Sequence, residues 1–104
     1  MTTEPTTTSL RVQDNPDRKR FEGYLGDELV GIVEYIPLDG KVIATHTEVL
    51  EAYEGQGLGS QLVTGMLEML QAEGRLVQPL CPYVAAYLQR HPEWADVVDP
   101  STPH

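Results

Sequence analysis

The sequence is short of cysteine, of basic residues and of long apolar runs, and each shortage excludes a class of protein. Cys81 is the single cysteine in 104 residues, so an internal disulfide cannot form, which suits a reducing compartment. No apolar run approaches the roughly 20 residues that span a bilayer, and no basic stretch followed by an apolar one opens the sequence. We therefore expect a cytoplasmic protein that does not bind membranes.

Lysine and arginine are scarce, with seven basic residues against sixteen acidic ones and a net charge of -9. Because affinity for nucleic acids comes mainly from basic side chains on phosphates, we expect no nucleic-acid binding. An acidic surface attracts cations such as amines or basic peptides, although the same charge also keeps a small domain in solution. The spacing of His, Cys, Asp and Glu matches no metal site, so we expect no metal.

The length allows one domain around one hydrophobic core. Residues 1–9 are rich in threonine and poor in apolar side chains, which predicts a disordered tail. We expect the folded domain to cover residues 10–98 and a short C-terminal tail to cover residues 99–104.

The first part of the domain has the pattern of strands. Alternating apolar residues between turn residues predict strands over 21–25 and 29–36, and a run of β-branched residues predicts another over 41–49. Short turns separate the three segments, so they form an antiparallel meander.

The second part of the domain has the pattern of helices. From Leu58 to Leu70 apolar residues recur every four positions, which predicts an amphipathic helix that ends before Gly74. A short strand over 76–80 and a second helix over 83–90 follow. Because a helix precedes it, the last strand should lie parallel to the final strand of the meander.

A glycine-rich segment, residues 53–60, joins the meander to the first helix, and we call it the glycine turn. Gly55, Gly57 and Gly59 stand at alternate positions and allow a ligand to approach the backbone closely. Free N–H groups at the helix start form an anion site, for which pyrophosphate is the natural ligand. The alternative is a tight connection that binds nothing. A Walker A loop is excluded because no lysine follows the glycines, and the dinucleotide fingerprint because Ser60 stands where its third glycine belongs.

This segment resembles the fingerprint of the GNAT acetyltransferase superfamily, Q/R-x-x-G-x-G/A. Gly57-Leu58-Gly59 fills the glycine half, whereas Glu54 stands where Gln or Arg is expected. The resemblance is closer to the small single-domain proteins called N-acetyltransferase domain-containing, and it covers roughly residues 21–98. Besides the glycine turn, the segments that carry it are 46–49, 79–83 and 91–93.

The resemblance implies an α/β (α+β) fold, with a mostly antiparallel sheet, one splayed parallel strand pair and helices on both faces. It also implies that a monomer or weak homodimer transfers an acetyl group from acetyl-CoA to an amine acceptor. A non-catalytic acyl-CoA-binding or protein-interaction module on the same fold is the alternative. The residues implied to bind the cofactor are Val49, Tyr53, Glu54, Gly55, Gln56, Gly57, Leu58, Gly59, Ser60, Cys81, Pro82 and Tyr83.

Four residues are candidates for the chemistry, and each has a structural alternative. His46 and Glu48 are two positions apart on a strand, so they share a face and could relay the proton of the amine. Cys81 precedes the second helix, where a thiol becomes more nucleophilic, and by resemblance it lies near the acetyl thioester as a covalent carrier or as a wall of the pocket. By resemblance Tyr87 lies near a tyrosine that protonates the departing thiolate, although core packing is the favoured explanation.

Overall fold

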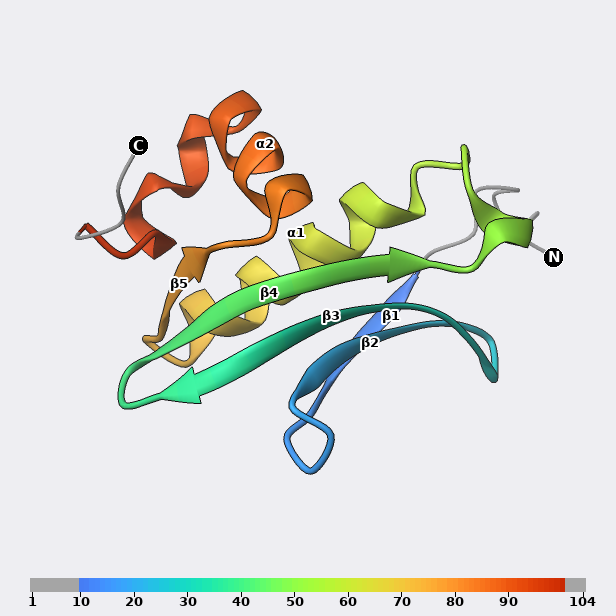
Figure 1. Cartoon of the computed structure of the whole chain (residues 1–104), viewed down its shortest axis with the longest axis horizontal. Helices are drawn as coiled ribbons and strands as arrows, with labels where there is room; N and C mark the ends of the chain where they lie inside the picture. Colours follow the sequence, from blue (N-terminus) through green and yellow to red (C-terminus); the bar gives the residue numbers. More distant parts are fainter. Residues whose placement is uncertain (1–9, 101–104) are drawn as a thin grey trace, which may run out of the picture.

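The computed structural model describes residues 10–100, whose strands form a single five-stranded sheet (Figure 1). The sheet order is β1-β2-β3-β4-β5, and all neighbours are antiparallel except β4 and β5, which are parallel. The predicted meander, both helices and the parallel last strand are confirmed. The bounds are β1 Arg11–Asn15, β2 Arg20–Leu25, β3 Glu28–Leu38, β4 Lys41–Val49, η1 Glu51–Tyr53, α1 Leu58–Ala72, β5 Leu76–Pro79, α2 Pro82–Arg90 and η2 Pro92–Val97.

Strand β1 is an element that the sequence pattern does not predict. Its residues are mostly polar, yet they pair with β2 from Arg11–Tyr24 to Asn15–Arg20. Val12 lies against α1 at Gly65, where an added Cβ would be only 2.5 Å from Val12 Cγ2. Packing on the helix, which a local pattern cannot reveal, therefore holds this strand in place.

A bulge in β4 decides which of its side chains face the helices. Glu34 of β3 pairs with His46, but the next residue of β3 pairs with Ala44, so Thr45 is an extra residue in β4. Before the bulge the buried Ala44 faces the helices, and after it Thr47 does. His46 therefore points to the opposite face, where its side chain is 56% exposed.

Strands β4 and β5 separate beyond Ala44. Their pairing runs only from Lys41–Leu76 to Ala44–Pro79. The carbonyl of Ala44 then accepts the N–H groups of both Leu80 and Cys81, each at 2.9 Å, and the chain turns into α2. Within the described residues, no strand pairs with the remaining part of β4 on this side. The predicted splay of the parallel pair is thus present.

Helices α1 and α2 pack against the same face of the sheet. One core joins Val42 of the sheet with Leu62 of α1 and Val84 of α2. The two helices also contact each other, because the hydroxyls of Thr64 and Tyr87 share a hydrogen bond. In Figure 1, β4 accordingly passes in front of α1. The α+β class is confirmed, but the described helices occupy one face instead of the expected two, since turns alone connect β1 to β4 and leave no helix for the other face.

Candidate functional site

The glycine turn lines a depression of about 390 Å³ at the point where β4 and β5 separate. It brings together residues of β4, of the turn, of the first turn of α1 and of α2. Of the predicted cofactor residues, Gln56, Ser60, Cys81 and Pro82 do not line it. The lining residues are Thr47, Val49, Tyr53, Glu54, Gly55, Gly57, Leu58, Gly59 and Tyr83.

Two of the glycines have a backbone that other residues rarely adopt. Gly55 and Gly57 have φ of 82° and 76°, and no atom lies within 4 Å of a Cβ built at either position. Gly57 is also the N-cap of α1 and supplies no side-chain acceptor for the first N–H groups of the helix. The turn therefore offers open space beside backbone donors, as an anion site requires.

Gly59 lacks a side chain for a different reason. A Cβ at this position would collide with the hydroxyl of Tyr83, which packs from α2 onto the first turn of α1. Gly59 thus allows α2 to approach α1, and Tyr83 forms one wall of the depression while remaining 41% exposed.

Tyr53 ties the glycine turn to the start of β3. Its hydroxyl donates a hydrogen bond of 2.6 Å to Glu28 Oε1, and this bond to the carboxylate raises the pKa of Tyr53. The Tyr53 N–H donates to the carbonyl of Leu50, which closes the short helix η1. The turn is therefore held on one side by η1 and on the other by α1.

Cys81 lies behind the depression rather than in its wall. It is the N-cap of α2, with Pro82 at the first helical position, and only 4% of its surface is exposed. Its Sγ is 3.2 Å from Oγ1 of Thr47, which does line the depression. Thr47 is a site residue that the sequence does not reveal, because its orientation depends on the bulge in β4.

His46 and Glu48 share a face, as their spacing predicts. Thr47 and Val49, which alternate with them along β4, line the depression at the glycine turn. His46 and Glu48 therefore point to the opposite face of the sheet. His46 Nε2 is 3.9 Å from Glu48 Oε1, and the two side chains are 56% and 66% exposed. Neither of them lines the depression at the glycine turn.

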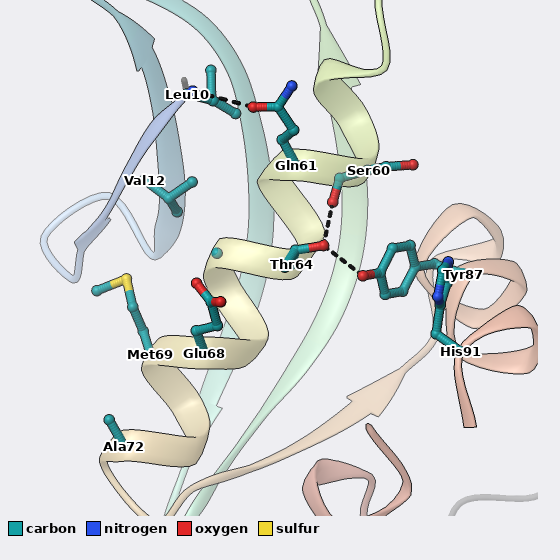
Figure 2. Close-up of a pocket in the computed structure, with 11 residues that line it drawn as sticks. Leu10, Val12, Ser60, Gln61, Thr64, Glu68, Met69, Ala72, Tyr87 and His91 are labelled. Carbon is teal, nitrogen blue, oxygen red and sulfur yellow. Dashed lines mark hydrogen bonds between the residues drawn. The ribbon is translucent and has the colours of Figure 1, made fainter. Parts of the chain in front are cut away.

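Tyr87 and Ser60 line a second depression, of about 710 Å³, on the outer side of α1 (Figure 2). The Tyr87 ring is 4% exposed and stacks on His91 with ring centroids 4.2 Å apart, and its hydroxyl is bonded to Thr64. These contacts favour packing as the role of Tyr87. The larger depression runs from Leu10 across α1 and lacks the left-handed glycines, so the smaller one is the better candidate for phosphate.

Among residues 10–100, no group of three or more His, Cys, Asp or Glu side chains could hold a metal ion. No helix in this part of the chain is long and apolar enough to cross a membrane.

A sheet that splays beside a glycine turn at a helix start defines the class of acyl-CoA-dependent N-acyltransferase folds. The family model described as GCN5-related N-acetyl-transferase matches residues 20–97, and the chain therefore belongs to this family.

Curated relatives and a solved structure agree with the family. Protein NATD1 of Mus musculus is 31% identical over 88 residues, which cover 80% of this chain and 77% of the relative. Protein NATD1 of Danio rerio is 30% identical over 90 residues, covering 82% and 79%. The solution structure of a GCN5-like protein from Staphylococcus aureus superposes with a TM-score of 0.66 at 18% identity, over 94% of this chain and 96% of that one. The solved structure supports the fold alone.

Proposed function

We propose that the protein transfers an acetyl group from acetyl-CoA to an amine. The observation that carries this proposal is the position of the glycine turn, which opens where β4 and β5 separate, next to Thr47 and in front of Cys81. Membership of the GCN5-related N-acetyltransferase family supports the same reaction class.

The glycine turn fits the pyrophosphate of acetyl-CoA. Gly55 and Gly57 leave open space, and the uncapped first-turn N–H groups of α1 add the positive end of the helix dipole. Glu54 brings no positive charge where the family fingerprint has Gln or Arg. We therefore assign phosphate binding to backbone amides. Such a site needs no basic side chain, so it can exist in a protein whose net charge is negative.

The open side of β4 fits the thioester end of the cofactor. Leu50 N–H donates to the carbonyl of Val30 on β3 at 2.8 Å. Successive N–H groups of an extended strand point to opposite sides, so the Val49 N–H points toward the gap. A donor fixed there can support the oxyanion that forms when an amine attacks the acetyl carbonyl.

The cofactor supplies an activated acetyl group, and the residues of this chain orient it and move the proton. The amine nitrogen forms a bond to the acetyl carbon, the carbon–sulfur bond breaks, and the thiolate leaves as CoA. His46 and Glu48 lie on the open side of β4, where they can take the proton that the amine loses. Cys81 acts as a wall behind the thioester, because its burial suits packing.

Thermal unfolding tests cofactor binding. A tenfold excess of acetyl-CoA over Kd should stabilise the fold by about 1.4 kcal/mol, which raises Tm by roughly 5 °C or more. Gly57→Val should abolish this shift, because the side chain fills the space over the helix start. Gly40→Val is the matched control: Gly40 has φ of 77° and equally open surroundings, but it lies in the β3–β4 turn. A Gly57→Val protein that keeps the wild-type shift would contradict the proposal.

Turnover separates the enzyme from a module that only binds acyl-CoA. Among residues 10–100, no helix covers the sheet face that carries His46 and Glu48, which is the observation that favours a binding module. Release of CoA thiol with a panel of primary amines supports the enzyme. A cofactor-dependent Tm shift without thiol release for any amine supports the module.

A further inference from the structure

A third depression lies on the open face of the sheet, beside the candidate acetyl site. Its volume is about 210 Å³. Glu48 and Ile32 are cross-strand partners on this face, and Glu48 belongs to the part of β4 that β5 leaves unpaired. The residues that line it are Arg20, Leu29, Val30, Gly31, Ile32, Glu48 and Leu50.

The walls of this depression are mainly aliphatic. Leu29, Ile32 and Leu50 supply side chains, and Leu50 is 46% exposed although it is large and apolar. A volume of 210 Å³ equals roughly seven water molecules in the liquid. An apolar group of about six to eight non-hydrogen atoms would fill it and cover Leu50.

Two charged side chains, Arg20 and Glu48, line the depression, and they differ in how closely they are paired. Arg20 Nε is 2.8 Å from Glu22 Oε2, and Glu22 also accepts hydrogen bonds from Tyr24 and Asn15. This guanidinium is therefore already neutralised. Within residues 10–100, the ion-pair partner of Glu48 is the exposed His46 at 3.9 Å, so its carboxylate is available to a cation.

We propose that this depression is the acceptor site, and that the acceptor is a primary amine with an apolar tail. This inference rests on the proposed acetyl transfer. The tail packs against Leu29, Ile32 and Leu50, and the ammonium group lies at Glu48, on the side of β4 opposite the glycine turn. Glu48 takes one proton from the ammonium, the nitrogen forms its bond to the acetyl carbon, and the carbon–sulfur bond breaks. The second proton that the nitrogen loses passes through water to the leaving CoA thiolate, and Glu48 releases its proton to the solvent.

The test is the acetylation rate of ethylamine, butylamine, hexylamine and spermidine, measured as CoA thiol release. For the wild type, kcat/KM should rise about fourfold per buried methylene from ethylamine to hexylamine. Spermidine, whose chain carries further charges, should be a poorer acceptor than hexylamine. A preference for spermidine, or equal rates for ethylamine and hexylamine, would overturn the inference.

Two variants of the pocket and one of the carboxylate sharpen this test. Ile32→Trp should fill the depression and lower kcat/KM for hexylamine much more than for ethylamine. Ile36→Trp is the matched control, since Ile36 is 49% exposed on the same strand and face but outside the depression. Leu50→Ala should reduce the hexylamine preference even if Ile32→Trp does not fold. Glu48→Gln should lower kcat/KM about a hundredfold for every amine without changing the acetyl-CoA Tm shift.

The possible results distinguish a failure of the acceptor-site inference from a failure of the proposed acetyl transfer. Acetylation that proceeds with an unchanged chain-length preference in both Ile32→Trp and Leu50→Ala disproves the apolar acceptor site alone. Absence of any thiol release from wild-type protein with all four amines disproves the acetyl transfer and the acceptor site together.

Discussion

At the scale of single residues, the contact between Tyr53 and Glu28 sets the start of the glycine turn. The bond crosses from η1 to β3 at 2.6 Å and is exposed, so it contributes little to the stability of the whole fold. Its effect should fall on the turn, whose donors must be in place before phosphate binds.

We predict that Tyr53→Phe weakens acetyl-CoA binding about fivefold, which corresponds to roughly 1 kcal/mol for one lost hydrogen bond. Tm without ligand should stay within about 1 °C of the wild type. Glu28→Gln keeps an acceptor oxygen and is the control that should bind nearly normally, whereas Glu28→Ala should resemble Tyr53→Phe. Calorimetric titration measures all four proteins, and equal affinities would show that the turn needs no such contact.

Cys81 combines a helix-start position with burial, and burial decides what its thiol does. With 4% of its surface exposed and Sγ beside Thr47, it cannot meet an acetyl group without movement of its neighbours. We predict that intact-mass spectrometry detects no acetyl adduct after incubation with acetyl-CoA. Cys81→Ala should keep turnover within about tenfold and lose roughly 1 kcal/mol of stability to the small cavity. An adduct together with complete loss of turnover in Cys81→Ala would establish a covalent carrier instead.

The sequence predicts the glycine turn and the shared face of His46 and Glu48, but it does not predict that Thr47 faces the helices. Alternation predicts that Thr47 faces away from its neighbours, yet it cannot say which face holds the helices, because the bulge at Thr45 reverses the alternation within β4. Likewise Gly59 looks like a ligand glycine, although its missing side chain makes room for Tyr83, which lies far away in sequence.

At the scale of elements, α1 and β1 show how packing overrides local preference. Gly65 sits inside α1, where alanine would be intrinsically better by about 1 kcal/mol. An added Cβ would nevertheless lie 2.5 Å from Val12 Cγ2 and 2.7 Å from Val12 Cβ. The helix therefore accepts a poor helix former so that β1 can lie against it.

We predict that Gly65→Ala destabilises the protein by about 1–2 kcal/mol despite its better helix propensity, because overpacking displaces β1. The double variant Gly65→Ala/Val12→Gly should recover most of that loss relative to Val12→Gly alone, since both Val12 atoms that the new Cβ would meet are gone. Urea unfolding measures the four proteins of this cycle. A stabilised Gly65→Ala protein would mean that β1 does not pack on α1 in solution.

At the scale of the whole molecule, the order of elements and the parallel last strand follow from periodicity and connection rules. The open face of the sheet does not, because it depends on there being no helix among the connections before β4. That face carries both the proposed acceptor site and the buried carboxylate of Glu22. The ionisation of Glu22 therefore affects both the stability of the fold and, through Arg20, the charge at the proposed acceptor site.

Acid stability tests that link, because two effects of opposite sign compete as pH falls. Protonation relieves the repulsion within a chain of net charge -9, which favours the folded state. At Glu22, burial raises the pKa, but hydrogen bonds from Arg20, Tyr24 and Asn15 lower it more, so the pKa lies below the ordinary value of 4.5. A lowered folded-state pKa gives stability that is complete above 4.5 and is lost as pH falls through the folded value.

We predict that the free energy of unfolding of the wild type decreases more steeply between pH 5 and pH 3 than that of Glu22→Gln. The repulsion effect is nearly the same in both proteins, so their difference isolates Glu22. Tyr24→Phe removes one donor and should give an intermediate slope. Urea unfolding at both pH values measures this, and parallel slopes in all three proteins would show that the Glu22 cluster does not favour its ionised form. The carboxylate of Glu22 also pairs with Arg20, which lines the acceptor depression. Protonation of Glu22 would therefore leave the guanidinium of Arg20 without its counter-ion, and this positive charge should repel an ammonium ion in the depression.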